Sequence, residues 1–356
     1  MASTFKTFLN NDKTTTRTLL HEAIPITGTI VSGTYGDFGS ERNIKNYSHG
    51  MFQSVYDYPY LSSSANHIFD LTVGFAATSS LSASTQDNIQ RKNKINMYNQ
   101  MAQVLMGHDA NGNIQRFDID GNLADGAGKM NEVIFINLAR LLNKDEIKKG
   151  SFKLDLGVHQ QFIAAVDTQL RLSDSSGSSG YFVNSPAGEY GVLYGNDLVN
   201  APMTTEGAAG GLIFYQAGIA VLTASIFNTP YIGIASEMDA AGDGIDALLT
   251  GSTISGACDA FRHRMANLQF NNTTELNSTI YFCRLNNNEF NYSSNPTYLS
   301  ASQIVTKTVS TDLPVSYITT VGLYSADNEL LATAKLSEPL RKDPSNEITI
   351  RTRLDY

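Results

Sequence analysis

The stretch SYITTVGLYSADNELLATAKLSEPLRKDPSNEITIRTRLDY, residues 316–356, decides the fold class of this chain. Its first two runs, 316–325 and 328–336, are rich in the β-branched, aromatic and aliphatic residues that fit a pleated strand. Between them, Asp327-Asn328 supplies turn residues, so the two runs predict an antiparallel hairpin. After Pro344, the run EITIRTRLDY is expected as a last strand.

Strand patterns also occur upstream of this stretch. Phe152, Leu154 and Leu156 alternate with polar residues or glycine, which is the period of a half-buried strand. Residues 212–215 and 219–222 are two apolar runs that we expect to form a buried hairpin, and STIYFCRL (278–285) is another strand. Together these patterns predict an α+β, β-rich fold of antiparallel sheets or sandwich-like units with a few inserted helices.

Three segments carry helical spacing. A helix is expected from about Thr85 to Met106, ended by Gly107, because its apolar residues recur at three- and four-residue steps. The later half of residues 131–149 is expected as a helix with Leu138, Leu141 and Leu142 on one face. Within 236–270, the spacing of the following residues predicts a further helix: Cys258, Phe261, Met265 and Leu268.

Residues 109–125 are rich in Asp and Asn. Asn111-Gly112 and Asp120-Gly121 are favoured turn pairs, and residues 114–119 between them are expected as the short strand of a small hairpin. Such oxygen-rich loops suit calcium, but Gly121 is fourth counted from Asp118, whereas a calcium loop requires glycine at position six. Turn chemistry is therefore favoured, and weak calcium binding at 109–125 stays open.

The chain is expected to divide into five regions, because 356 residues exceed one comfortable core. They are an amino-terminal β/loop region or arm (1–84), a helical and hairpin region (85–150), a β-rich domain (151–235) with a flexible loop at 173–180, a helical segment (236–270) and a carboxyl-terminal antiparallel β domain (271–356).

Composition excludes several classes of protein. The formal net charge of -9, without a cluster of Lys and Arg, argues against nucleic-acid binding. The most apolar segment, 212–227, is shorter than the roughly 20 residues that cross a bilayer, so no membrane contact is expected. The two cysteines, Cys258 and Cys283, are too few for a disulfide framework and are expected in the core.

Catalytic signatures are absent from the sequence. The six histidines are isolated, and no HExxH, CxxC, G-x-S-x-G or phosphate-loop motif occurs. We therefore expect no catalytic residue, no metal and no cofactor, and a protein that is not an enzyme. Two carboxylates distant in sequence would suffice for a glycosidase, so a polysaccharide-degrading enzyme stays the least favoured alternative.

The 316–356 stretch resembles a sequence that recurs in virion structural proteins of tailed bacteriophages, above all contractile-tailed ones. In those proteins a strand ending in IGLY is followed by a turn, an LLA strand, a KLS-P segment and a last strand. The matching positions here are Thr320–Tyr324, Glu329–Lys335, Leu336–Leu340 and Ile348–Tyr356. Residues 131–156, 190–227 and 278–298 are also similar to such proteins.

This resemblance implies a structural subunit of a phage tail, most specifically a baseplate (wedge) component. Its partners would be other tail or baseplate subunits and tail fibres, through self-association or a hetero-oligomer. Its location would be the tail of the virion, after assembly in the host cytoplasm. The alternatives are a neck or head-to-tail connector protein and a virion-associated polysaccharide-degrading enzyme.

Two groups of residues are candidates for subunit contacts, because aromatic and apolar side chains anchor interfaces. They are Tyr56, Tyr58 and Tyr60, and Val321, Leu323 and Tyr324. The alternative for the tyrosine run is a local core. The Asn-, Ser- and Thr-rich composition suits permanent assembly, since amides and hydroxyls can pair across a junction at less desolvation cost than charges.

Overall fold

The computed structural model describes residues 5–27, 42–82, 89–123, 128–157, 169–197, 209–227, 253–292, 299–300, 303–304, 309, 311 and 314–356. Among these residues, every helix is too short or too polar to cross a lipid bilayer.

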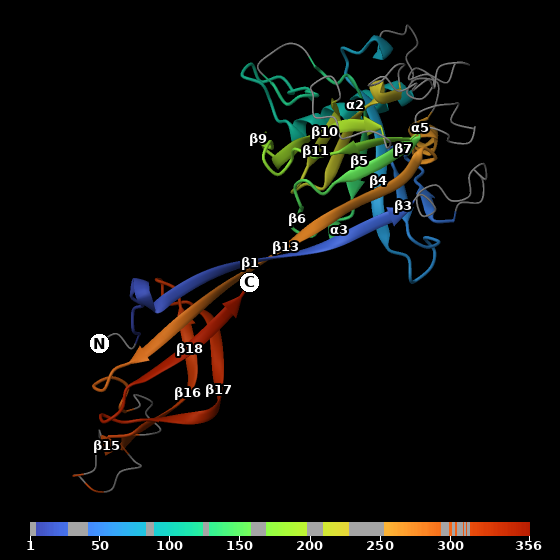
Figure 1. Ribbon diagram of the computed structural model, residues 1–356. Coiled ribbons are helices and arrows are strands. Elements are labelled where there is room, and N and C mark those ends of the chain that lie inside the picture. The colour runs from blue at the N-terminus through green and yellow to red at the C-terminus, as the bar shows by residue number, and fades with distance from the viewer. Residues whose placement is uncertain are drawn as a thin grey trace. The chain divides into compact units, whose positions relative to one another are not determined.

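The chain forms two compact units (Figure 1). The smaller unit comprises Met1–Leu19 and Glu275–Tyr356, and the larger unit is Leu20–Thr274. Two hydrogen-bonded strands have residues in both units, β1 (Lys13–Thr27) and β13 (Met265–Leu285). The smaller unit is thus made from the two ends of the chain.

Antiparallel strands dominate the larger unit, which confirms the β-rich α+β prediction. Beyond β1 and β13, they are β2 (Ile44–Asn46), β3 (Gln53–Tyr56), β4 (His67–Phe75), β5 (Glu132–Leu138), β6 (Glu146–Ile147), β7 (Lys153–Gly157), β8 (Gln169–Ser173), β9 (Phe182–Ser185), β10 (Gly188–Asp197), β11 (Ala209–Phe214) and β12 (Ile219–Thr223). The strand order is β1-β13-β7-β8-β10-β11-β12-β5-β4-β3-β2, with β6 on β13 and β9 on β10.

Three helices accompany the sheet: α2 (Ile89–Leu105), α3 (Arg140–Asn143) and α5 (Ile254–Arg262). Short 3-10 turns occupy Asn10–Asp12, Ser80–Ser82 and Ala224–Phe227. Helix α2 packs closely on β4, because a Cβ at Gly74 would lie 2.8 Å from the carbonyl oxygen of Lys94. Glycine at position 74 therefore permits this packing.

Both faces of the central strands are buried, in two separate hydrophobic clusters. Along β5, Val133 and Phe135 point into the cluster that includes residues of α2, whereas Ile134 and Ile136 point into the cluster that includes residues of α5. This burial on both sides explains why β5 is a continuous apolar run and not an alternating one.

The sheet of the larger unit curls around the α5-side cluster. Ile26 of β1 and Ile44 of β2 belong to this one cluster, although β1 and β2 stand at opposite ends of the strand order. Leu154 of β7 and Val73 of β4 join it as well. The antiparallel sheet therefore encloses its own core, as the sandwich-like prediction requires.

Several predicted elements are confirmed. Helix α2 covers most of the predicted 85–106 helix, and Gly107 follows it with a positive φ of 76°. Strands β11 and β12 form the predicted hairpin, with Phe214 opposite Ile219. The strand predicted around Leu154 is β7.

The helix predicted in the later half of residues 131–149 is wrong in extent. Helix α3 has only four residues, Leu138 belongs to β5 and Leu141 is exposed. Lys144, with a positive φ of 58°, follows the helix, and β6 begins at Glu146. Strand pairing of β5 and β6 outweighs the helical spacing of the leucines.

The helix predicted through Cys258, Phe261, Met265 and Leu268 is right only in its first half. Helix α5 is capped by the Thr253 hydroxyl, which accepts from the Gly256 N–H at 3.1 Å, and it ends at Arg262. Met265 and Leu268 lie on β13, opposite Leu156 and Leu154 of β7. Residues 236–252 of this predicted segment lie outside the described residues.

The hairpin predicted at residues 111–121 is wrong, although both turns exist. Gly112 and Gly121 have φ values of 81° and 77°. Residues 114–119 form no strand; two isolated bridges, His108 to Ile114 and Asp118 to Lys129, replace it.

The segment 173–180, predicted as a flexible loop, forms a series of turns anchored by Asp174. Its carboxylate accepts from the N–H groups of Gly150 and Phe152 at 2.7 and 2.8 Å. The Gly177 N–H donates to the Asp174 carbonyl at 2.7 Å.

The smaller unit contains β16 (Ser316–Tyr324), β17 (Leu330–Lys342) and β18 (Ile348–Asp355), with short strands β14 (Leu299–Ser300) and β15 (Gln303–Ile304). Strand β18 pairs with β13. Strands β16 and β17 form a two-stranded antiparallel sheet, called the ribbon below. It is the predicted carboxyl-terminal hairpin, and Asn328 in its turn has a φ of 64°.

Candidate interaction surface

The two units differ in charge. The smaller unit has ten Lys and Arg residues and ten Asp and Glu residues in the sequence, so its formal net charge is zero. The chain's charge of -9 therefore belongs to the larger unit. A neutral unit lacks the net repulsion that keeps protein surfaces apart.

The smaller unit also has little apolar core. Of its described residues, only Leu285, Leu323 and Ile350 are buried apolar side chains, and neither hydrophobic cluster includes any of its residues. A unit of this size normally buries far more apolar surface. It therefore has less hydrophobic stabilisation than the larger unit.

Polar contacts hold the smaller unit together instead. Lys342, at the end of β17, is buried, and its ammonium group donates to Asn291 Oδ1 at 2.7 Å and to the carbonyl oxygens of Asp343 and Asn287 at 2.9 and 3.3 Å. Arg284 pairs with the buried Asp12 carboxylate at 2.7 Å. These contacts tie the end of β17 and the amino-terminal segment to the turn regions around β13.

The amino-terminal segment lies against the strands of the smaller unit. The rings of Phe5 and Tyr324 are 4.5 Å apart, and those of Phe8 and Tyr281 are 5.3 Å apart. Lys6 pairs with Glu289. Of the amino-terminal region predicted over residues 1–84, residues 5–8 thus form a strap over this unit, whereas its described residues from Leu20 onward belong to the larger unit.

The ribbon exposes large apolar side chains. Tyr317 is 64% exposed and Leu331 is 69% exposed, and each is the second residue of its strand. The exposed apolar side chains of β16 and β17 are Tyr317, Tyr324, Leu330, Leu331 and Leu340. Such a gathering on one hairpin is typical of an interaction surface rather than of scattered surface residues.

The structure separates the two predicted contact groups. Tyr56, Tyr58 and Tyr60 lie in the larger unit, whereas Val321, Leu323 and Tyr324 lie on β16 in the smaller unit.

On β16, the three predicted residues have different surroundings. Tyr324 is 43% exposed and presents its ring at the surface, where it meets Phe5. Val321 is half-buried, and Leu323 is 7% exposed. Leu323 therefore packs inside the unit and leaves little side chain for a partner, while Tyr324 is available.

The tyrosine run combines local packing with exposure. Tyr56, at the end of β3, has its ring 6.3 Å from Tyr60 and 5.5 Å from His67, and burial and then the neighbouring Tyr47 raise its pKa. Tyr58 is 59% exposed. Tyr56 thus belongs to a small aromatic cluster, and Tyr58 and Tyr60 are the exposed members of the run.

Four exposed residues of the ribbon were not predicted as contact residues from the sequence: Tyr317, Leu330, Leu331 and Leu340. The exposure of Leu330 or Leu331 could have been predicted from the sequence, because two adjacent leucines on a strand point to opposite faces of a two-stranded ribbon. At least one of them then lies on the outer face. Tyr317 and Leu340 carried no such signal.

The 109–125 loop uses its side chains for turns. Asp109 Oδ1 accepts from the N–H groups of Asn111 and Asn113, both at 2.9 Å, and these bonds lower the pKa of Asp109. Asp120 accepts from the Asn122 N–H at 2.8 Å. Among the described residues, no three His, Cys, Asp or Glu side chains converge as metal ligands. The turn interpretation accounts for the described part of the loop.

A surface groove of about 630 Å³ lies beside this loop. It is lined by Asp120, Gly121, Asn122, Leu123, Phe182, Asn184 and Tyr194. Asp118 is fully buried beside it and paired with Lys129, and burial raises the pKa of Asp118 to about 6. The described lining therefore contains one carboxylate, Asp120, and not the separated pair that a glycosidase needs.

Both cysteines are reduced. Cys258 on α5 is buried, as predicted, and burial raises the pKa of its thiol. Cys283 on β13 is only partly buried, which corrects the expectation that it lies in the core.

Comparison of the chain with protein-family models, with curated proteins and with solved structures finds no match.

Proposed function

We propose that this chain is a structural subunit of a bacteriophage tail, and within the tail a baseplate (wedge) component that joins neighbouring subunits and holds tail fibres. The phage assignment rests on the sequence resemblance carried by residues 316–356. The observation that best supports an assembly role is the ribbon of the smaller unit, which exposes five large apolar side chains over a unit with three buried ones.

A two-stranded ribbon is marginally stable by itself in water. Burial of a large apolar side chain contributes about 1.5–3 kcal/mol. If a partner covers Tyr317, Tyr324 and Leu331, the contact supplies apolar burial that the unit lacks on its own. Assembly would then stabilise the fold of the smaller unit as well as the complex.

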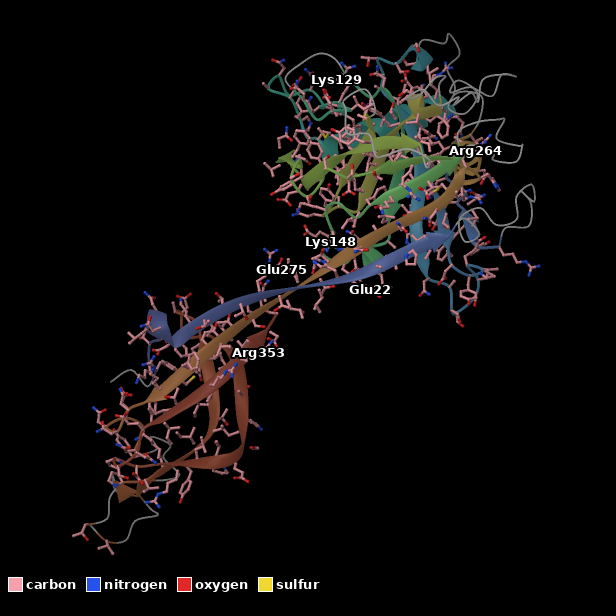
Figure 2. The ribbon with its side chains drawn as sticks, in the orientation of Figure 1. Glu22, Lys129, Lys148, Arg264, Glu275 and Arg353 are labelled. Atoms are coloured by element: carbon pink, nitrogen blue, oxygen red, sulfur yellow. The ribbon has the colours of Figure 1, made fainter. Side chains whose placement is uncertain are left out.

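The charge distribution also fits an assembly role. The neutral smaller unit can approach another subunit without net repulsion, and some of its charged side chains are paired locally, as in Arg353 with Asp355 at 2.7 Å. Arg353 is labelled in Figure 2. The larger unit has a formal net charge of -9, which disfavours binding to nucleic-acid phosphates. The partners that this chemistry fits are proteins.

The composition of purified particles tests the proposal. Particles of a phage that encodes the chain are purified on a density gradient, and their proteins are quantified by mass spectrometry. We expect the chain in a fixed ratio to the other tail proteins, unchanged by a high-salt wash. A chain that is absent from particles would contradict the proposal.

The same preparation separates this proposal from the enzyme alternative. The purified chain is incubated with capsular or lipopolysaccharide glycan of the host, and new reducing ends are measured. A structural subunit releases none, whereas steady release of reducing ends would replace the structural assignment by the enzymatic one.

A further inference from the structure

Exposed strand edges are places where a second strand can add, and proteins normally guard them with charges, proline, bulges or short strands. The described strands of this chain differ sharply in this respect. Every edge strand longer than four residues is guarded except β16.

Strand β17 is the best-guarded example. Ile318 pairs with Leu340 and Thr320 pairs with Lys335, so the four residues 336–339 of β17 bulge opposite the single residue Thr319. That bulge includes Glu338 and Pro339, and proline cannot donate to a further strand. The outer edge of β17 is thereby closed to strand addition.

The other edges carry charge or are short. Strand β1 has Lys13, Arg17 and Glu22, and β18 has Arg351 and Arg353. The remaining edge strands have two to four residues: β2, β6, β9, β14 and β15.

Strand β16 is long and has neither charge nor proline, and both register shifts in its pairing with β17 place the extra residues on β17. Its nine residues, SYITTVGLY, contain no charged side chain and no proline, and five of them are β-branched or tyrosine before Gly322. Its only partner among the described strands is β17, so within the described part of the chain its other edge is unpaired. Thr319 and Thr320, adjacent in sequence, are both exposed, which leaves the middle of the strand open.

We propose that the free edge of β16 pairs antiparallel with β16 of a second copy of this chain, about a two-fold axis near Thr320. The two ribbons then form one four-stranded sheet. A second copy is one partner within the proposed assembly role, and the pairing itself rests on the strand edges and charges of this chain.

A second copy fits the chemistry of β16 for two reasons. In two-fold antiparallel pairing, residues near the axis face their own counterparts, so a charge there would meet a like charge; an uncharged strand avoids this repulsion. The smaller unit is also neutral, whereas the larger units, each at -9, repel one another. Contact through β16 thus joins two uncharged strands of two neutral units.

The pairing predicts which side chains meet. When the two strands overlap fully, Thr320 lies opposite Thr320 of the second copy, and Tyr317 lies opposite Leu323. Thr320, exposed in the single chain, would gain its own counterpart as a neighbour, whereas the buried Leu323 would offer little of its side chain to Tyr317. Cross-strand contacts of this kind are the unit of sheet stabilisation.

Sedimentation of the full chain over a dilution series tests the proposal, with Thr320→Glu as the key variant. Glutamate at 320 faces Lys335 on β17, so it suits the ribbon of the single chain, but it would face its own copy in the dimer. We expect the dissociation constant of the dimer to rise at least about tenfold, which corresponds to about 1.4 kcal/mol.

The matched control is Thr333→Glu, the same change at an exposed position of the guarded strand β17. It should leave dimerisation within about twofold of the wild type. A wild-type chain that stays monomeric at every concentration, or equal weakening by both variants, would overturn the proposal.

Hydrogen exchange on the unaltered protein gives a second readout in case Thr320→Glu fails to fold. Amides of residues 316–324 on the free edge should gain protection as concentration rises and lose it on dilution, while those of β18 should not change. Concentration-independent exchange in β16 would overturn the proposal. A chain that is monomeric yet present in phage particles would contradict this inference and leave the proposed function standing.

Discussion

The ammonium group of Lys342 donates a hydrogen bond of 2.7 Å to Asn291 Oδ1, inside a unit whose described residues include only three buried apolar side chains. Two carbonyl oxygens, of Asp343 and Asn287, complete its surroundings. A buried lysine is costly unless its donors are satisfied, and here all three of its donors have acceptors. Buried hydrogen bonds such as these thus help to stabilise the smaller unit, whereas hydrophobic packing stabilises the larger one.

Replacement of this anchor should destabilise the smaller unit. Lys342→Met keeps the length of the side chain but leaves three acceptors without their donor, so we expect a loss of about 1–3 kcal/mol in the free energy of unfolding. Chemical denaturation followed by tyrosine fluorescence measures it. The matched control is Lys335→Met on the same strand, which is exposed and should change stability by less than about 0.5 kcal/mol. Equal effects of the two variants would show that Lys342 is not an anchor.

The pair of Arg171 and Asp155 should matter more than exposed ion pairs. These residues face one another on β8 and β7, joined by bonds of 2.6 and 2.8 Å, and Asp155 is buried. Arg171→Met should cost about 1–3 kcal/mol, because it leaves a buried carboxylate unpaired. In a double-mutant cycle with Asp155→Asn, the second change should cost less than it does alone.

The exposed pair of Arg353 and Asp355 on β18 is the comparison for Arg171. Arg353→Met should cost no more than about 1 kcal/mol. If Arg353→Met lowered the free energy of unfolding as much as Arg171→Met does, burial of Asp155 would not make its ion pair more stabilising than an exposed one.

Stability should depend on pH through Asp174. Burial raises the pKa of this carboxyl from 3.8 to about 6, despite the two N–H donors from Gly150 and Phe152. Because the folded-state pKa lies above the unfolded value, stability from this group is present below about pH 4 and is lost as pH rises through about 6. Asp174→Asn cannot titrate, so the stability of the wild type relative to this variant should fall by up to about 3 kcal/mol over that range.

Thermal unfolding of both proteins across this pH range is the measurement for Asp174. Asp118, whose pKa burial also raises to about 6, is common to both proteins and cancels in the comparison. If the stability of the wild type relative to Asp174→Asn increased with pH, the hydrogen bonds that the carboxylate accepts would stabilise its charged form more than burial destabilises it.

The exposed ribbon should be needed for assembly but not for folding. Leu331→Ser removes an apolar side chain that is 69% exposed, so it should leave the unfolding free energy within about 0.5 kcal/mol. Phage that carry the variant should incorporate less of the chain into particles, measured by quantitative mass spectrometry. Normal incorporation of Leu331→Ser, together with Tyr317→Ser, would exclude the ribbon as the assembly surface. Thr311→Ala, at an exposed position outside the ribbon, is the control.

Local patterns predicted the parts of the fold that local physics controls. The ribbon follows from its turn at Asp327-Asn328, the β11 and β12 hairpin from two short apolar runs, and α2 from its spacing and the glycine after it. In each of these elements, propensity, pattern and turn chemistry agree.

Long-range pairing explains where sequence reasoning failed. Met265 and Leu268 have helical spacing with Cys258 and Phe261, but β7, more than a hundred residues upstream, pairs with them as a strand. The smaller unit joins the first and last parts of the chain through β1 and β13, and no local pattern marks that joining. For the candidate surface, sequence pointed to β16 and Tyr324, but only the structure shows that Leu323 faces inward.

Immunogold labelling of intact particles, with antibodies raised against the purified chain, tests the central claim most directly. We expect gold at the distal end of the tail, where a baseplate component belongs. Labelling at the junction of head and tail would instead identify a connector. A chain that remains soluble and labels no part of the particle would contradict the assignment to the virion.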